Sequence, residues 1–283
     1  MARLKFLLAF LALLICAGGV SGAYFYWKNF ALPDIVVTRH MDGKDSGILE
    51  KPDLGKRHYD AAIQLLKDGE LLSGRDRLLY LIEYYPESKT YLEAKRVVGE
   101  VNLDLLISNI PLEGKKEHIV TSGEALVMIA RRGETTIDYL MRVNGKTTAL
   151  IYPDEALVVY PLEFRAEINL KKKKLTLFDK DKFFKEYTIV DTNLPSGLKP
   201  PVTTSVSEKV AWHIDRSVNF TNENYLHCRK WVRTGTVGLF IRQDDSKKDA
   251  DRERRPYGVM VKKSDMEEIF TILRNGSKVE LVN

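Results

Sequence analysis

The chain has 283 residues, of which 44% are hydrophobic and 29% are charged, and its formal net charge is +5. This composition excludes a largely disordered chain and indicates a folded protein with a sizeable core. The length suits two or three compact units. The densest basic run, residues 171–174, is expected to be a solvated strand or turn, and no nucleic-acid-binding motif accompanies it, so we expect no nucleic-acid partner.

The first 27 residues are predicted to be a membrane segment. A short basic stretch, residues 1–5, precedes residues 6–27, which carry no charge. A helix of about 20 apolar residues can cross the hydrocarbon core of a bilayer. The aromatic residues 24–27 would lie at the far membrane interface. We therefore expect a single-pass anchor over residues 1–27, with the bulk of the chain outside the cytoplasm.

Two other interpretations of this segment remain open. Residues 21–23 are small and would suit cleavage of a signal peptide, and Cys16 would be the modified residue of a lipoprotein, although Ile15 stands where such signals have a small residue. The apolar run continues past residue 23 into bulky aromatics, which favours the retained anchor. Beyond this segment the sequence has one cysteine, Cys228, so we expect no disulfide, no metal site and no cofactor there.

Residues 28–54 are rich in glycine, proline and aspartate and are predicted to be a linker. Residues 55–109 are predicted to be helical, because apolar side chains recur there at helical spacing. Turn signals at Asp68-Gly69 and at residues 85–88 separate three stretches. The apolar positions of these stretches are Tyr59, Ala62, Ile63, Leu65 and Leu66, then Leu78, Leu79, Leu81 and Ile82, then Leu92, Val97, Val98, Val101 and Leu105.

The spacing of Tyr59, Ala62 and Leu65, followed by the Tyr-Tyr-Pro-Glu-Ser turn, resembles a tetratricopeptide-like helical hairpin. The match covers about one and a half repeats, too few for a superhelical binding groove. We expect a small helical spacer that packs on its neighbour. The alternative is a binding surface for an envelope protein.

The stretch at residues 110–114 breaks the helix and opens a new unit over residues 115–161. Its periodicity changes between strand and helix spacing, which predicts a β-α-α-β unit. The expected elements are a strand at residues 118–120, helices at 124–132 and 136–143, and a second strand at 156–159.

This unit resembles a LysM module at residues 118–132, 135–145 and 151–161, and the second stretch contains the family's asparagine as Asn144. The resemblance implies that the unit binds peptidoglycan of a bacterial envelope. It implies a groove that holds N-acetylglucosamine-containing chains, mainly by backbone hydrogen bonds. The residues carried over to this groove are Gly123, Glu124, Ala125, Leu126, Asn144, Ile151, Tyr152 and Pro153.

The local residues fit this arrangement on physical grounds. Ser122-Gly123 allows a tight turn, Glu124 suits the positive end of the first helix, and Asn144-Gly145 can cap the second helix in a left-handed conformation. Asn144 is therefore a helix cap, a glycan contact or both.

Two residues depart from the LysM pattern. Ala125 replaces the usual threonine and Asp154 the usual glycine. Loss of one hydrogen bond costs about 0.5–1.5 kcal/mol, so we expect weaker glycan binding than in a standard module. A fold kept only for packing is the alternative.

From residue 164 to residue 283 the pattern is rich in strands. The order of these segments resembles a YkuD-type L,D-transpeptidase domain and implies a mainly-β fold. The segments that carry the resemblance are residues 166–170, 174–178, 183–190, 209–212, 237–240, 264–270 and 275–281.

Such an enzyme needs a cysteine thiolate, a histidine that activates it and donors for the oxyanion. Phe240 stands where the histidine is expected, Val259 at or beside the cysteine position, and Val261 near the arginine position. A deletion of the nucleophile is the alternative alignment. Residues 244–255, between these landmarks, are predicted to be a solvated loop. We therefore expect no catalytic residues and a scaffolding or regulatory role.

Cys228 is the other candidate nucleophile, within His227-Cys228-Arg229. On a strand, the side chains of His227 and Cys228 would point to opposite faces, out of hydrogen-bond reach. We expect a packed free cysteine there and structural roles for His118 and His213. A cell-wall enzyme with displaced catalytic residues, such as an L,D-transpeptidase, remains the alternative function.

The sequence thus predicts a multidomain α+β protein. Its parts are an N-terminal transmembrane helix, a short tetratricopeptide-like helical segment, a β-α-α-β LysM module and a C-terminal mainly-β L,D-transpeptidase-like domain. We expect it in a bacterial cytoplasmic membrane with its bulk in the periplasm. The expected partners are peptidoglycan, the membrane and an envelope protein.

Overall fold

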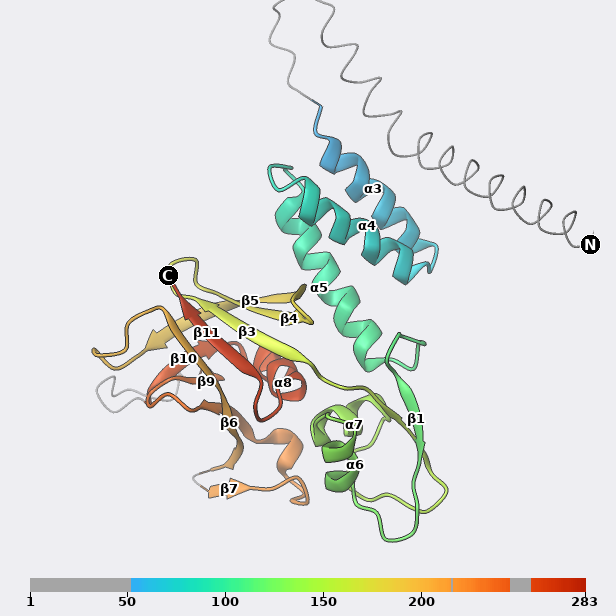
Figure 1. Cartoon of the computed structure of the whole chain (residues 1–283), viewed down its shortest axis with the longest axis vertical. Helices are drawn as coiled ribbons and strands as arrows, with labels where there is room; N and C mark the ends of the chain where they lie inside the picture. Colours follow the sequence, from blue (N-terminus) through green and yellow to red (C-terminus); the bar gives the residue numbers. More distant parts are fainter. Residues whose placement is uncertain (1–51, 215, 245–255) are drawn as a thin grey trace, which may run out of the picture.

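The computed structural model describes residues 52–214, 216–244 and 256–283. The predicted anchor, most of the predicted linker and most of the charged stretch 244–255 lie outside these ranges. Within them, no helix is both long enough and apolar enough to cross a membrane. The described chain runs from a group of helices through a small β-α-α-β unit into a β domain (Figure 1).

The helical segment consists of α3 (Leu54–Lys67), α4 (Leu71–Tyr84) and α5 (Tyr91–Ile107). These bounds confirm the predicted helices and the turns between them. The Asp53 carboxylate caps α3 by accepting a hydrogen bond from the N–H of Lys56 at 3.2 Å. The three helices share a small core, made of Ala62, Leu78, Leu81, Ala94 and Val98.

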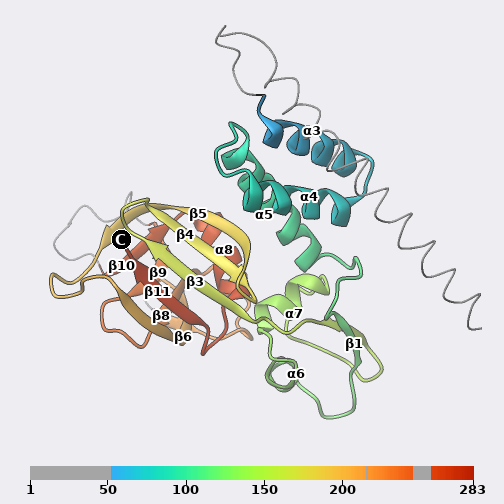
Figure 2. The same cartoon turned by 45° about the horizontal axis from the view of Figure 1, so that its top comes forward.

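Helix α5 continues past this small core and lies against the β domain (Figure 2). The side chain of Asn102 donates to the carbonyl of Phe184 at 2.8 Å. The ammonium group of Lys185 forms ion pairs with Glu100 of α5 and with Glu268, each at 2.8 Å. These contacts tie the helical segment to the β domain, so the segment packs on its neighbour rather than standing apart.

The β-α-α-β unit comprises β1 (Lys116–Ile119), α6 (Leu126–Arg132), α7 (Ile137–Val143) and β2 (Ala156–Val159). The strands pair antiparallel, with His118 opposite Leu157. The predicted order of elements is confirmed, but the first helix begins two residues later than predicted. Ala125, its N-cap, has extended backbone angles (φ −126°, ψ 152°) and keeps Glu124 outside the helix.

The C-terminal domain is mostly β and barrel-like. Its strands are β3 (Phe164–Asn169), β4 (Lys174–Asp179), β5 (Lys182–Asn193), β6 (Val202–His213), β7 (Arg216–Val218), β8 (Arg229–Thr234), β9 (Phe240–Gln243), β10 (Gly258–Val261) and β11 (Lys278–Val282). They form one sheet in the order β11-β3-β4-β5-β10-β9-β8-β6-β7. A further pairing of β6 with β11, with Ser205 opposite Lys278, closes the sheet on itself. The basic run 171–174 includes the exposed turn between β3 and β4, as expected.

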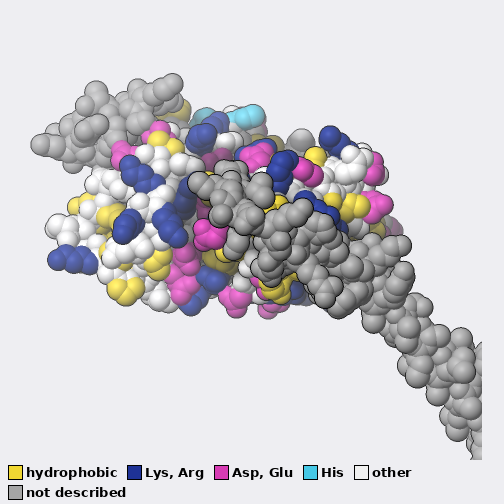
Figure 3. All heavy atoms as spheres, turned by 90° about the horizontal axis from the view of Figure 1, so that it is seen from above, with side chains coloured by type: hydrophobic (Ala, Val, Ile, Leu, Met, Phe, Trp, Pro, Cys, Tyr) yellow, Lys and Arg dark blue, Asp and Glu magenta, His cyan; other side chains and the backbone are white. Residues whose placement is uncertain are grey.

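Helix α8 (Lys263–Ile272) follows β10 and packs on β8, β9 and α7. One continuous core extends from the β-α-α-β unit into the β domain, and it includes Leu126, Tyr139 and Leu157 as well as Leu177 and Val259. The hydroxyl of Thr136 also donates to the carbonyl of Thr271 at 2.6 Å. The unit is therefore built into the rest of the protein. Basic and acidic side chains alternate on the face seen in Figure 3, without a large patch of one sign.

Candidate functional site

Two loops of the β-α-α-β unit, residues 121–125 and 151–155, lie side by side. Val120, at the end of β1, joins them. Its N–H donates to the carbonyl of Glu155 at 2.9 Å, and its carbonyl accepts from the N–H of Asp154 at 2.8 Å. Both bonds are made by the backbone, so the close approach of the two loops does not depend on their side chains.

These loops contain all of the predicted glycan-binding residues except Leu126, the first residue of α6, and Asn144. Gly123, Ala125, Tyr152 and Pro153 are exposed. The side chain of Leu126 is buried in the core at 1% exposure, so only its backbone could meet a ligand. The loops thus present mainly backbone and one large ring, that of Tyr152, which is 66% exposed.

The exposed loops contain backbone groups that are not used within the protein. Among the described residues, the N–H groups of Gly123 and Ala125 and the carbonyl of Ile151 form no hydrogen bond. Gly123 has φ +82°, and no atom lies within 4 Å of the place where its Cβ would be. Unused peptide groups on an open surface can bind a neutral polar ligand, since each is a strong donor or acceptor.

Glu124 does not have its predicted role at the end of a helix. Its carboxylate turns back, accepts from the N–H of Thr121 at 2.8 Å and lies 2.9 Å from Nε2 of His118. It also pairs with Arg132, and its side chain is only 7% exposed. The side chain of Glu124 therefore stabilises the first loop by binding to Thr121 and His118. His118 has the structural role expected of it.

Asn144 belongs to neither loop and lies at the C-terminal end of α7, where it lines a cavity together with Glu155. Its amide donates to the carbonyls of Leu140 at 2.9 Å and Val158 at 3.1 Å, and its side-chain oxygen accepts from the N–H of Val158 at 2.7 Å. Gly145 follows with φ +62°, as a helix C-cap requires. This geometry supports the helix-cap interpretation of Asn144 and adds a second role, which is to fasten α7 to β2.

The two departures from the LysM pattern have different structural consequences. Asp154 has φ +67°, a region in which glycine is favoured but aspartate is tolerated. Ala125 gives α6 no side-chain cap, whereas Thr136 caps α7 by accepting from the N–H of Tyr139 at 3.0 Å. A threonine at position 125 would therefore act first as a helix cap, and its loss weakens the start of α6.

Sequence reasoning missed the residue that holds the second loop. The Glu155 carboxylate accepts from the N–H of Tyr152 at 3.1 Å and from the ammonium group of Lys146 at 2.5 Å. The hydrogen bond from Lys146 lowers the pKa of Glu155 below its ordinary value. The signal in the sequence was the position of Glu155, three residues after Tyr152. At that spacing a carboxylate can accept a hydrogen bond from the N–H of the first residue of the turn.

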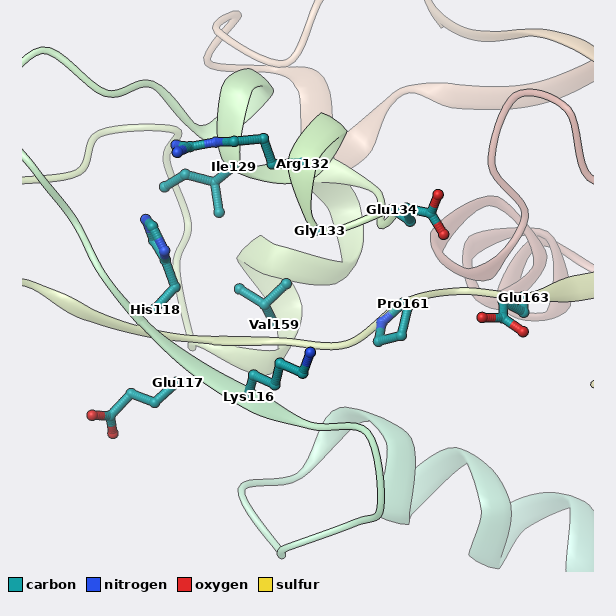
Figure 4. A pocket seen from close by; sticks show the side chains of 10 residues that line it. All are labelled: Lys116, Glu117, His118, Ile129, Arg132, Gly133, Glu134, Val159, Pro161 and Glu163. Atoms are coloured by element: carbon teal, nitrogen blue, oxygen red, sulfur yellow. The ribbon is translucent and has the colours of Figure 1, made fainter.

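A cavity of about 490 Å³ lies beside α6, between that helix and the two strands of the unit (Figure 4). The side chains of His118 and Val159 point toward Ile129, and Glu117 points away from them. None of its charged lining side chains is fully buried, and His118 is already bound to Glu124. Basic and acidic side chains both line this cavity, so its chemistry favours no single class of ligand.

The positions aligned with a catalytic histidine and cysteine lie on neighbouring strands. β9 and β10 run parallel, and Val259 is paired with Ile241, so Val259 and Phe240 point to opposite faces of the sheet. Val259 is fully buried. On β10 the residue nearest to Phe240 is Gly258, whose Cβ would lie 3.3 Å from that of Phe240. Gly258, which precedes Val259, is therefore the residue of β10 that faces Phe240.

This strand pair contains no nucleophile. The Phe240 ring stacks on Trp231 with 6.3 Å between centroids, and the buried guanidinium group of Arg242 donates to the carbonyl of Pro256 at 3.1 Å. Val261 is buried in the core. None of the side chains of β9 and β10 carries a thiol, a hydroxyl or an imidazole. Among the described residues, no group of three His, Cys, Asp or Glu side chains is placed to hold a metal ion.

Cys228 does not lie on a strand, which corrects the prediction. His227 ends a short 3-10 helix, η2 (Tyr225–His227), and β8 begins after Cys228. The thiol is 2% exposed and donates to the carbonyl of Asn224 at 3.2 Å. Burial raises the pKa of this thiol, which disfavours the nucleophilic thiolate. The geometry therefore supports a packed structural cysteine.

Charged side chains that sequence reasoning also missed meet where α7 approaches β6 and β8. Asp138 of α7 lies near Lys209 of β6 and Lys230 of β8. Lys230 occupies the core-facing side of its strand together with Val232. A lysine in phase with apolar strand residues was the signal in the sequence.

Neither a protein-family model nor a curated protein matches the chain. Solved structures match it in part. An L,D-transpeptidase from Stackebrandtia nassauensis is 14% identical over 43% of this chain and 56% of that one, with a TM-score of 0.32. A fused zinc-dependent amidase, peptidase and peptidoglycan-binding protein from Clostridium acetobutylicum is 11% identical over 42% and 51%, with a TM-score of 0.31.

An L,D-transpeptidase from Enterococcus faecium is 15% identical over 60% of this chain and 68% of that one, with a TM-score of 0.30. The chain spans about half the length of the Stackebrandtia nassauensis and Clostridium acetobutylicum proteins. Superpositions at this level are too loose to carry a functional argument, which has to rest on the residues of the site.

Proposed function

We propose that this chain is a peptidoglycan-binding envelope protein that holds N-acetylglucosamine-containing glycan between loops 121–125 and 151–155, in the manner of a LysM module. The observation that carries the proposal is the open pair of loops at one end of a β-α-α-β unit, with peptide groups that are not used internally. The resemblance of residues 118–161 to LysM supports the same reading.

The chemistry of the loops suits an acetamido sugar. An acetamido group has one N–H donor and one carbonyl acceptor, and the loops offer N–H groups at Gly123 and Ala125 and a carbonyl at Ile151. Two of the three carboxylates of the loops, Glu124 and Glu155, are bound within the protein, whereas Asp154 is exposed. The exposed Tyr152 ring offers an apolar face on which a sugar can stack.

The rest of the chain positions this unit. Residues 1–27 anchor the protein in a bacterial cytoplasmic membrane, and the described domains lie in the periplasm. The C-terminal domain is an L,D-transpeptidase-like scaffold or regulator without catalytic residues. The absence of a nucleophile or a proton acceptor from β9 and β10 supports this role, as does the buried thiol of Cys228.

Co-sedimentation of the full-length chain with purified sacculi tests the binding proposal. Because the unit shares its core with the β domain, point variants are preferable to a deletion. We expect Tyr152→Ala to weaken pelleting several-fold, since an exposed ring that stacks on a ligand contributes about 1 kcal/mol. Tyr84→Ala is the matched control, because Tyr84 is also an exposed tyrosine, 59% accessible on α4. Pelleting that is absent in the unmodified chain would contradict the proposal.

Incubation of the chain with tetrapeptide muropeptides tests the scaffold proposal against the enzyme alternative. We expect neither cross-linked nor exchanged products. A product that disappears in Cys228→Ala would overturn the scaffold role and assign the chemistry to that thiol.

A further inference from the structure

A second cavity, of about 440 Å³, opens between α6 and α7 of the β-α-α-β unit and β6 and α8 of the β domain. Arg131, Asp138 and Lys209 provide charges along its wall, and the rings of Tyr225 and Phe270 provide apolar surface. Two further carboxylates of the lining are paired within the protein, Glu134 with Arg274 and Glu208 with Arg233. The cavity is distinct from the proposed glycan-binding loops 121–125 and 151–155, and from β9 and β10.

Two lysines share the carboxylate of Asp138, and of these two Lys209 lines this cavity and Lys230 does not. Oδ1 of Asp138 accepts from the hydroxyl of Tyr225 at 3.0 Å and lies 3.6 Å from the ammonium group of Lys230. Oδ2 of Asp138 accepts from the ammonium group of Lys209 at 3.4 Å. The ammonium group of Lys230 is completely buried and makes no hydrogen bond within the described chain. An ammonium group has three protons to donate, so both lysines retain donors that the protein does not satisfy.

The surroundings of these lysines are poor in compensating charge. The Lys230 ammonium lies 3.4 Å from the Tyr225 ring centroid, and that of Lys209 lies 4.3 Å from the Phe270 centroid. Burial lowers the pKa of both lysines and raises that of Glu267, the next nearest carboxyl group. A buried charge is stable only when it is paired, and here a second carboxylate would complete the pairing.

The rim of the cavity offers a further cation. Arg131 is exposed on α6 and forms no ion pair with any described residue. With Lys209 deeper in the cavity, Arg131 makes a path of positive charge, and the aromatic rings favour a ligand with apolar parts. A short peptide that ends in a free carboxylate has both properties.

Helix α6 connects this cavity to the groove. The first groove loop ends at Ala125, where α6 begins, and Val127 and Arg131 of the same helix line the cavity. A helix of this length extends about 10 Å, and three or four extended residues of a peptide span about the same distance. A peptide attached to a sugar in the groove can therefore reach Lys209.

We propose that this cavity binds the free carboxylate of a short peptide carried by the glycan strand that occupies the groove. The carboxylate pairs with Lys209 at the base, Arg131 attracts it at the rim, and the rings of Tyr225 and Phe270 contact the apolar side chains of the peptide. The route of the peptide along α6 rests on the proposed glycan binding, whereas the chemistry of the cavity does not.

Calorimetric titration of the full-length chain with four ligands tests this proposal. The ligands are a glycan that carries tetrapeptides, the same glycan with its peptides removed, the free tetrapeptide, and the tetrapeptide with its carboxylates amidated. We expect the peptide-bearing glycan to bind about tenfold more tightly than the bare glycan, because a hydrogen bond to a charged group is worth about 1.5 kcal/mol or more. The amidated peptide should bind less tightly than the free one.

Two variants locate the effect. Arg131→Gln should reduce the advantage of the peptide-bearing glycan about threefold, the size of an exposed ion pair, and Arg57→Gln on the remote helix α3 is the charge-matched control. Lys209→Met should abolish the advantage, with thermal unfolding as the check that the variant is folded.

Equal affinities for peptide-bearing and bare glycan would overturn the peptide site and leave the glycan groove intact. A second outcome is that the free tetrapeptide binds, that Lys209→Met abolishes this binding, and that the bare glycan does not bind. This outcome would uphold the peptide site and overturn the glycan groove. Failure of all four ligands to bind would overturn both.

Discussion

The loop pair of the β-α-α-β unit and the strand pair β9–β10 are both places where distant segments meet and where the sequence departs from a family pattern. In the loop pair, Ala125 and Asp154 are the departures, yet the loops still lie side by side and open to solvent. In the strand pair, Phe240 and Val259 are the departures, and the strands still pair in register.

The two places differ in the kind of atom that each function requires. Binding by peptide groups depends on the path of the chain, which tolerates substitution as long as the turn geometry holds. Nucleophilic attack depends on a sulfur atom and a ring nitrogen, which no backbone geometry can replace. A protein can therefore keep a binding site through substitutions that remove a catalytic one.

Asn144→Ala should destabilise the β-α-α-β unit that carries the loop pair, and this is the largest expected effect. This variant removes two hydrogen bonds that join α7 to β2 and one at the end of α7 itself, and each is worth about 1 kcal/mol. We expect the free energy of unfolding to fall by about 2–3 kcal/mol, as measured by denaturant titration. Asn109→Ala, at an exposed asparagine close by, should change it by less than about 0.5 kcal/mol. Equal effects of the two variants would contradict the role given to Asn144.

Gly123→Ala tests whether the path of the loop matters more than its side chains. Gly123 has φ +82° in open space, so an added Cβ introduces backbone strain without a clash, at about 1–2 kcal/mol. Gly197→Ala is the matched control, because Gly197 is equally open but has no positive φ. We expect glycan affinity to fall in the first variant and remain unchanged in the second. An unchanged affinity in both would show that the backbone of this loop is not the binding element.

Ala125→Thr should sharpen the comparison by restoring a residue of the LysM pattern. Because position 125 is the N-cap of α6, a threonine there should stabilise the protein by about 1 kcal/mol, measured as a higher unfolding midpoint. Thr136→Ala, at the corresponding cap of α7, should cost more than this, because it also removes the hydrogen bond to the Thr271 carbonyl. If Ala125→Thr raises glycan affinity without any change in stability, the hydroxyl acts on the ligand and not on the helix.

The smallest expected effect is a loss of glycan binding in acid. The pKa of Glu155 is lowered from its ordinary value of 4.5, so the bonds of its carboxylate to Lys146 and Tyr152 are fully formed above that pH and are lost as pH falls through the folded-state pKa. Binding measured from pH 7 downward should hold until the pH is below the ordinary pKa of 4.5 and should decline at lower pH. Glu155→Gln should flatten this decline. A profile that is the same in both proteins would remove Glu155 from the account.

Local signals in the sequence predicted most elements, because their causes are local. Turn residues such as Asp68-Gly69 separated the helices, and the second strand of the β-α-α-β unit was predicted with its observed bounds. The start of α6 was missed since Ala125 provides no capping signal, while Glu124 resembles a first-turn residue.

The remaining features depend on contacts between distant segments. The pairing of β6 with β11 and the shared core of the two units have no signature in any short stretch of sequence. The same holds for the meeting of Asp138 with Lys209 and Lys230, since a lysine in a strand does not reveal its partner. Six of the eight predicted groove residues belong to two loops joined by Val120, and Leu126 follows the first loop as the start of α6. Asn144 lies at the end of α7, where its amide is bound to α7 and β2.

The most direct test of the central claim is an amide NMR titration of the full-length chain with a peptide-free oligomer of N-acetylglucosamine. We expect saturable shifts at the amides of Gly123, Ala125 and Tyr152, with none at Phe240 or Gly258. Shifts confined to β9 and β10, or no shifts at loops 121–125 and 151–155 at millimolar ligand, would contradict this claim.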